Sequence, residues 1–316
     1  MIAGVIGYRN HSARIINFIK KNSAIKKIIV FNYRKNFIKL FDKKNKINFV
    51  NKLNQLNSCN LIFITSPSKT HVKYIKYFHN KYIFCEKTAG ISKKDYLYLK
   101  ALKKRNINKI YINYNILLSK LFVFLSNFIR NKKYGKIINL SINDCNGLAF
   151  KKNLINNWRF SSKSIFENIS GNVGSHYVNL FLNLFGKIKN SKIFISSVKK
   201  NRDNAKIYLE NNNSIKANYF LSYSSPLHFE ISCFKTNGIF KFINNKILIY
   251  HPRDNFNNKG YFVKPKLNKT INLNYEKDYL YSLKKSVDSF IYNSRNKKKF
   301  KNNDFDNAID TLKFFL

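Results

Sequence analysis

Three polar segments directly follow apolar runs rich in β-branched residues, and their side chains have the types needed at a nucleotide site. Gly7 ends the first run and opens GYRNHS, the segment TSPSKTH (Thr65–His71) follows a later run, and Glu86–Lys87 follows the next. A glycine turn between a strand and a helix brings backbone N–H groups and the positive helix N-terminus toward a pyrophosphate. The carboxyl ends of parallel strands share one sheet edge, so we expect these segments beside the ligand crevice.

Each segment also has a plainer interpretation. Arg9 and Ser12 stand at the second and third glycine positions of G-x-G-x-x-G, and such an incomplete motif, taken by itself, is more typical of an ordinary βα turn. A guanidinium can contact phosphate directly, so Arg9 could compensate in part for the lost glycine. A lone Glu86–Lys87 pair is typical of a surface ion pair, and His71 is typical of a residue at a helix start.

The end of the second apolar run bears on the choice of nucleotide. An acidic residue usually accepts the ribose hydroxyl at this place, whereas this chain has Asn32, Tyr33 and Arg34. The site is therefore at least as compatible with NADP as with NAD.

The elements that must position these segments alternate between strand and helix patterns over residues 1–118. Such alternation predicts a doubly wound parallel sheet, which makes this part a Rossmann domain. The five predicted strands are Ile2–Ile6, Lys27–Phe31, Leu61–Thr65, Tyr82–Cys85 and Lys109–Tyr114.

The pattern changes over residues 119–316 to short strands and turns. The spacing of Leu121–Ile129 predicts a linking helix, and two further helices are expected at Tyr275–Tyr292 and from about Asp304. Between them the runs predict a mainly antiparallel open sheet, and so an α+β domain. Its predicted strands are Lys136–Ile142, Lys192–Val198, Ala205–Leu209, Ser214–Tyr223, Leu227–Phe234, Gly238–Phe242 and Lys246–Tyr250.

Composition favours a cytoplasmic globular protein. The longest apolar stretch, Ile116–Ile129, is broken by Lys120 and is shorter than the ~20 residues that span a bilayer. The N-terminus reads as a buried strand, so no export signal is expected. The four cysteines are too widely spaced for a zinc site or a dense disulfide framework, so we expect reduced thiols and no metal site.

The formal net charge of +44 would ordinarily indicate a nucleic-acid or anionic partner. Lys, Asn, Ile, Phe and Tyr share A/T-rich codons and are all abundant, so drift in base composition explains the excess without a ligand. The lysines are spread along the chain, and no RNA-binding motif accompanies them. We expect only non-specific, salt-sensitive adhesion to nucleic acids, and a nucleic-acid-binding module is the weakest of three functional hypotheses.

Six segments, taken together and in order, resemble the Gfo/Idh/MocA oxidoreductases, the family of glucose-fructose oxidoreductase and inositol dehydrogenase. They are spread over more than half of the chain. The segments are GVIGYRNHS (Gly4–Ser12), NLIFITSPSKTH (Asn60–His71), YIFCEKT (Tyr82–Thr88), INYN (Ile112–Asn115), NWRF (Asn157–Phe160) and GNVGSHYVNL (Gly171–Leu180).

The resemblance implies an NAD(P)-binding Rossmann domain and an open sheet that completes the substrate site and often forms the interface of a homo-oligomer. It implies a carbohydrate-type substrate, such as a sugar, a polyol or a sugar nucleotide used in polysaccharide biosynthesis. Lys87 falls on the lysine of the family's Glu-Lys-Pro motif and His176 on the histidine of its Asp-x-x-x-His motif, so both are candidate catalytic residues together with Asn172. The expected cofactor-binding residues are Gly7, Tyr8, Arg9, Asn10, Ser12, Asn32, Arg34, Thr65, Ser66, Pro67, His71, Glu86, Lys87, Asn115, Trp158 and Arg159.

Departures from the family pattern keep a second hypothesis open. Asn172 stands where the family has aspartate, so a charged partner of the histidine becomes a neutral amide. Thr88 replaces the proline after Lys87, which removes a residue that fixes φ. With Arg9 and Ser12, these changes favour a non-catalytic dinucleotide-binding relative with a binding or regulatory role.

Overall fold

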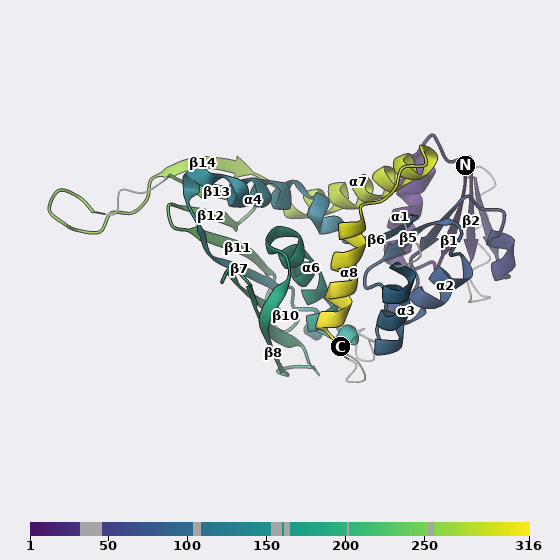
Figure 1. Cartoon of the computed structure of the whole chain (residues 1–316), viewed down its shortest axis with the longest axis horizontal. Coiled ribbons are helices and arrows are strands. Elements are labelled where there is room, and N and C mark those ends of the chain that lie inside the picture. The colour runs from purple at the N-terminus through teal and green to yellow at the C-terminus, as the bar shows by residue number, and fades with distance from the viewer. Residues whose placement is uncertain (32–45, 104–108, 153–159, 161–164, 201, 252–255) are drawn as a thin grey trace. The chain divides into compact units, whose positions relative to one another are not determined.

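The computed structural model describes residues 1–31, 46–103, 109–152, 160, 165–200, 202–251 and 256–316 (Figure 1). The chain forms two compact units. The first contains Met1–Leu118 and Leu280–Phe314, and the second contains Ser119–Tyr279.

The first unit is built on a parallel six-stranded sheet with the order β3-β2-β1-β4-β5-β6. The two halves of the sheet meet between β1 and β4, where an α/β fold of this order has its ligand crevice. The strands are β1 (Ile2–Ile6), β2 (Lys27–Phe31), β3 (Ile47–Val50), β4 (Leu61–Ile64), β5 (Tyr82–Glu86) and β6 (Ile110–Asn113). The helices are α1 (Asn10–Lys21), α2 (His71–Tyr77), α3 (Lys93–Lys103) and α8 (Asn302–Phe314), with most of α7 (Tyr275–Arg295).

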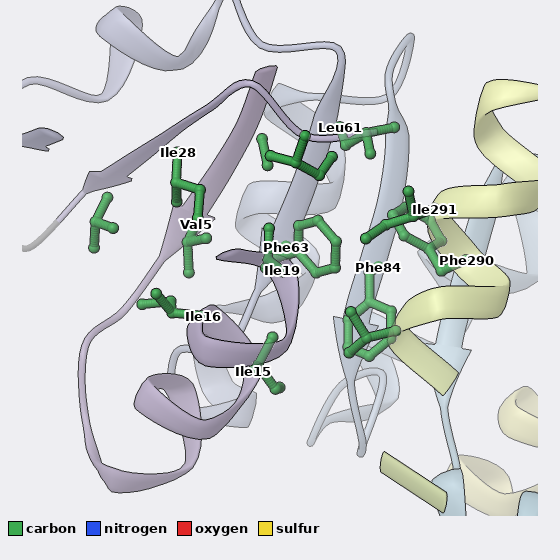
Figure 2. Packing of buried hydrophobic residues seen from close by; sticks show 14 of the residues in the cluster. Val5, Ile15, Ile16, Ile19, Ile28, Leu61, Phe63, Phe84, Phe290 and Ile291 are labelled. Carbon is green, nitrogen blue, oxygen red and sulfur yellow. The ribbon is translucent and has the colours of Figure 1, made fainter. Parts of the chain in front are cut away.

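Helices α1 and α7 bury apolar side chains against one face of this sheet. In α1 the apolar residues recur at helical spacing, so they form a single stripe toward the strands. Figure 2 shows Phe290 and Ile291 of α7 beside Phe63 of β4 and Phe84 of β5. The labelled members of this buried cluster are Val5, Ile15, Ile16, Ile19, Ile28, Leu61, Phe63, Phe84, Phe290 and Ile291.

The second unit contains an eight-stranded, mainly antiparallel sheet with the order β14-β13-β12-β11-β7-β10-β9-β8 (Figure 1). Among the described strands of this second sheet, only β7 and β10 pair in parallel. The strands are β7 (Ile137–Cys145), β8 (Ile188–Ser196), β9 (Asn204–Asn211), β10 (Lys216–Ser222), β11 (His228–Lys235), β12 (Gly238–Ile243), β13 (Lys246–Tyr250) and β14 (Leu267–Asn272).

The main helices of the second unit are α4 (Lys120–Arg130), α5 (Ile169–Asn172) and α6 (Gly174–Phe185). Helix α6 packs directly on the sheet, since a Cβ on Gly174 would lie 2.7 Å from Ile207 Cδ1 of β9. Asp278 accepts hydrogen bonds from the backbone N–H groups of Lys120 and Leu121, at 2.8 and 2.9 Å, and so caps the start of α4. At the other end of α4, Lys235 donates to the carbonyl oxygens of Phe128, Ile129 and Asn131.

The predicted fold class is confirmed in both parts. Two strands, β3 and β14, were missed, because Ile47–Val50 is an edge strand with no buried residue and Leu267–Asn272 is mostly exposed and polar. The first unit runs to Leu118 and takes up the chain again over Leu280–Phe314. Among the described helices none is long and apolar enough to cross a membrane.

Candidate functional site

The turn after β1 requires glycine for two reasons. Gly7 has φ +102°, a conformation that other residues rarely adopt, and its N–H donates to the carbonyl oxygen of Phe31 at 3.1 Å. A Cβ on Gly7 would also lie 3.1 Å from the backbone nitrogen of Ser66, in the segment after β4. The first glycine of the incomplete motif therefore marks the close approach of two loops at the carboxyl edge of the sheet.

The substitutions at the other two glycine positions have different structural consequences. Ser12 is 1% exposed, and its hydroxyl donates to the carbonyl oxygen of Thr65 at 3.3 Å, so a small polar residue fits between α1 and the next loop. Arg9 is the exposed residue just before α1, and its side chain makes no capping hydrogen bond. Asn10 starts the helix and is exposed, while Tyr8 packs edge-on against Phe49 with ring centroids 5.1 Å apart.

The segment after β4 is tied to the turn after β1. The Thr65 N–H and hydroxyl both donate to the carbonyl oxygen of Ile6, each at 3.0 Å. The Ser66 hydroxyl lies 2.7 Å from that of Thr70, and Pro67 precedes the short 3-10 turn of Ser68–Thr70. These contacts fix the loop that faces Gly7.

His71 joins two loops from inside the protein. The ring is fully buried, with Nε2 2.8 Å from the carbonyl oxygen of Ser66 and Nδ1 2.7 Å from that of Thr88. Burial lowers the pKa of His71, although both carbonyl oxygens favour the protonated ring. His71 therefore sets the position of the segment after Lys87 and presents no exposed surface.

Glu86, at the end of β5, is the centre of a buried polar network. Its Oε1 lies 3.0 Å from His11 Nε2 in the first turn of α1 and accepts a hydrogen bond from Asn113 Nδ2 at 2.7 Å. Ser286 of α7 donates to Asn113 Oδ1 at 2.6 Å and lies 3.1 Å from the Tyr111 hydroxyl. The network links α1, β5, β6 and α7 beneath the expected ligand crevice.

Charge in this network is balanced between two residues. Burial by itself would raise the pKa of Glu86, but the charge and hydrogen bond of His11, helped by Asn113 and Lys87, bring that pKa below its ordinary value. The negative charge of Glu86 raises the pKa of His11, against the effects of burial and of the cations Lys87 and Arg14. The His11 ring lies at the N-terminal end of α1, beside the Glu86 carboxylate.

Lys87 follows this carboxylate directly and is partly buried. The Lys87–Thr88 peptide bond is cis. The ammonium charge acts on His11, Glu86 and His71, so the structure brings the Glu86–Lys87 pair, the first turn of α1 and the segment after β4 into one neighbourhood. Asn115, also expected at the site, is 2% exposed and donates to the Ser282 hydroxyl at 2.8 Å.

The other two catalytic candidates lie in the second unit, at the junction of α5 and α6. Asn172 Nδ2 donates to the Tyr223 hydroxyl at 2.7 Å, and His176 is a half-buried residue in the first turn of α6. A Cβ on Gly171 would lie only 2.4 Å from the carbonyl oxygen of Ile165, so any side chain at this position, directly before Asn172, would clash with the backbone. Lys87 belongs to the first unit and His176 to the second.

Four predicted site residues, Asn32, Arg34, Trp158 and Arg159, lie outside the described residues. Sequence reasoning missed His11 and Asn113 as neighbours of Glu86. His11 follows the glycine turn and Asn113 ends a strand, but a single sequence does not show that their side chains converge on one carboxylate. In the part of the chain that the structure describes, no group of three or more His, Cys, Asp or Glu residues is arranged to hold a metal ion.

Neither a protein-family model nor a curated protein matches this sequence. Solved structures do match the fold, including myo-inositol 2-dehydrogenase from Lactobacillus plantarum, with a TM-score of 0.79 and 16% identity over 99% of this chain and 94% of that one. UDP-N-acetylglucosamine 3-dehydrogenase from Acidithiobacillus ferrooxidans matches with a TM-score of 0.74 and 14% identity, over 99% and 95% of the two chains.

An oxidoreductase from Agrobacterium radiobacter, solved with NAD+, L-tartaric acid and magnesium, matches with a TM-score of 0.77 and 13% identity, over 98% of this chain and 93% of that one. These similarities show a shared fold. They agree with the fold that the six sequence segments led us to expect.

Proposed function

We propose that this protein is an NAD(P)-dependent oxidoreductase that transfers a hydride between a nicotinamide cofactor and an alcohol or ketone of the sugar, polyol or sugar-nucleotide type. The observation that carries the proposal is the Gly7 turn, whose positive φ and close approach to the Ser66 loop lie at the carboxyl end of β1, in a sheet of the dinucleotide-binding order. The named activities of the structural neighbours support the same reaction class.

The residues at this turn fit a dinucleotide. The backbone of Gly7, Tyr8 and Asn10 lies at the start of α1, where a pyrophosphate is stabilised by N–H groups and the helix dipole. No side chain caps the helix at Arg9, and its guanidinium supplies a charge that a glycine would lack. His11, paired with Glu86, keeps this carboxylate from repelling the anionic ligand. From the sequence we assign Asn32 and Arg34 to contacts with the ribose of the adenosine. We assign Trp158 and Arg159 to further contacts with the cofactor.

When bound, the nicotinamide ring would give or accept the hydride. We assign the proton chemistry to this chain's own side chains, with His176 as the base for the substrate hydroxyl. Lys87 would orient that hydroxyl and stabilise the negative charge that develops on its oxygen. Asn172 would hold His176 in place while it donates to Tyr223.

We place the reaction in the cytoplasm and favour a sugar nucleotide or another precursor of a surface polysaccharide as substrate. We also propose that the open sheet of the second unit forms the interface of a homo-oligomer. Phe194 of β8 and Tyr208 of β9 pack edge-on with ring centroids 5.9 Å apart and are 47% and 45% exposed, so they offer apolar surface on that sheet.

A second candidate is a binding or regulatory protein that keeps the dinucleotide fold without turnover. The observation that favours it is Asn172, whose amide is committed as a donor to the Tyr223 hydroxyl and cannot carry the negative charge of an aspartate. Binding of the cofactor without hydride transfer to any sugar or polyol would support this alternative.

Titration with NADH and NADPH, followed by cofactor fluorescence, is the most direct test. We expect one of them to bind, and we expect Arg34→Asp to weaken NADPH more than NADH if Arg34 meets the 2′-phosphate. Equal losses for the two cofactors would remove Arg34 from this role. If neither cofactor binds in the millimolar range, the proposed function is wrong.

A further inference from the structure

The loop between β13 and β14 carries a cluster of exposed aromatic residues. Phe256, Tyr261 and Phe262 are 54%, 68% and 89% exposed, and the neighbouring Val263 is 40% exposed. Large aromatic side chains are normally buried, so a group of them at one loop end marks a contact surface. We call Phe256–Lys266 the aromatic tip.

The tip has a defined backbone, so the exposed side chains belong to a folded hairpin. Phe256 and Phe262 form an antiparallel bridge with their rings 5.1 Å apart. The side-chain oxygen of Asn257 accepts from the N–H groups of Lys259 and Tyr261, each at 3.0 Å, and Gly260 takes the positive φ of the turn. At the base, the His251 N–H donates to the carbonyl oxygen of Lys266 at 2.9 Å.

Charge indicates what the aromatic tip contacts. The segment contains Lys259, Lys264 and Lys266 and no acidic residue, and all three lysines are exposed. An anionic surface would attract these lysines, whereas the identical cationic tip of a second copy would repel them. Aromatic residues flanked by lysines are the side chains that settle at the headgroup level of a bilayer.

We propose that the aromatic tip docks this protein on the surface of an anionic phospholipid membrane. Phe256, Tyr261 and Phe262 enter the headgroup region, and the lysines pair with lipid phosphates. Attachment is peripheral and reversible, since the apolar part is only one short hairpin. The proposal is independent of the proposed oxidoreductase function.

The test measures binding to sedimenting vesicles at physiological salt. The variant Phe256→Ser/Tyr261→Ser/Phe262→Ser keeps the net charge and removes only the aromatic rings. The matched control is Tyr77→Ser/Phe150→Ser/Tyr292→Ser, whose rings are 47%, 57% and 57% exposed elsewhere on the chain. We expect the tip variant to bind phosphatidylglycerol vesicles about tenfold more weakly than the wild type, because the inserted apolar area is lost. The control variant should bind like the wild type.

Two further measurements separate insertion from general adhesion. Heparin, a soluble polyanion, should bind the wild type and the tip variant equally, because their charges are equal. A polarity-sensitive dye on Phe262→Cys should shift to shorter wavelength on phosphatidylglycerol vesicles, while the same dye on Tyr292→Cys should not. The native cysteines are all buried, so labelling is confined to the introduced thiol.

Equal vesicle binding by the wild type and the tip variant would overturn the proposal and leave charge as the whole cause of adhesion. The absence of wild-type binding to phosphatidylglycerol vesicles at physiological salt would also overturn it. A tip variant that changes the sedimentation coefficient of the free protein, with vesicle binding intact, would assign the tip to contacts between copies instead.

Discussion

His11 Nε2 lies 3.0 Å from Glu86 Oε1, so the first turn of α1 is joined to the carboxyl end of β5 by an ion pair. Asn113 and Lys87 also lower the pKa of the Glu86 carboxylate. The positive charges of Lys87 and Arg14 oppose the rise in the pKa of His11. The His11–Glu86 pair lies at the end of β5, directly before the expected catalytic Lys87. The protonation states of His11 and Glu86 therefore bear on both stability and ligand binding.

The first prediction is that Glu86→Gln lowers the pKa of His11, because the carboxylate is the main cause of its rise above the ordinary value of 6.5. A proton NMR titration of the His11 ring measures this directly and needs no cofactor. Glu230→Gln, in the other unit, serves as the control and should leave the His11 titration unchanged. An unchanged His11 titration in Glu86→Gln would show that the two side chains are not paired.

The same pair predicts how stability depends on pH. The raised pKa of His11 means that its contribution is fully present below 6.5 and is lost as pH rises through the folded value. The lowered pKa of Glu86 means that its contribution is present above 4.5 and is lost as pH falls through the folded value. Glu86→Gln should therefore destabilise the protein most between these limits. We expect about 1 kcal/mol or less, because the His11 side chain is 37% exposed.

The second prediction is that Gly7→Ala destabilises the protein by about 2 kcal/mol and weakens NADH or NADPH binding, because both the positive φ and the Ser66 contact resist a Cβ. Gly186→Ala is the matched control, with φ +80° but nothing within 4 Å of the added Cβ. The Gly186→Ala protein should lose only the free energy of unfolding that the positive φ costs, about 1 kcal/mol, and should bind cofactor normally. Urea unfolding and a fluorescence titration measure the two effects, and a Gly7→Ala protein that behaves like Gly186→Ala would remove the close approach from the site.

The third prediction is that Lys87→Met and His176→Ala reduce turnover by about two to four orders of magnitude while cofactor affinity stays nearly constant, since both residues are assigned to the proton side of the reaction. Steady-state kinetics and cofactor titration on the same preparations provide the comparison. If His176→Ala turns over its substrate at the wild-type rate, the histidine is structural and Lys87 becomes the first alternative base.

The fourth prediction is that Asn172→Asp increases the rate at high pH. The new carboxylate would accept a hydrogen bond from the Tyr223 hydroxyl, to which Asn172 now donates at 2.7 Å, and would supply a negative charge four residues before His176. A pH profile of kcat/KM for the wild type and the variant tests this. Superimposable profiles would show that Asn172 does not act on the base.

The fifth prediction is that Lys235→Met destabilises the protein by about 2 kcal/mol, because three carbonyl oxygens at the end of α4 lose their charged donor. Lys189→Met, at an exposed position of β8, is the control and should change the free energy of unfolding by less than about 0.5 kcal/mol. A Lys235→Met protein as stable as the control would show that solvent replaces the lysine at these carbonyl groups.

Much of the first unit follows from the sequence alone. β-branched runs of strand length alternate with helical spacing, and this pattern has only a few compact solutions, so the doubly wound sheet and the turn at Gly7 could be predicted. The second sheet was predicted for the same reason, from the period-two runs between Lys136 and Tyr250. Strand β14 was not predicted because it is an edge strand whose side chains are mostly exposed, so its sequence shows no alternation of apolar and polar residues.

Only the tertiary structure decides which side chains meet. Leu280–Phe314 lies near the end of the chain, yet it completes the core of the first unit, because Phe290 of α7 packs its buried ring against both Phe63 and Phe84. His11 and Asn113 are far apart in the sequence, yet both contact the Glu86 carboxylate, and Ser286 from near the end of the chain donates to Asn113. The sequence by itself determines the local preferences for strand, turn and helix. The convergence of distant side chains depends on long-range packing, which local preferences do not encode.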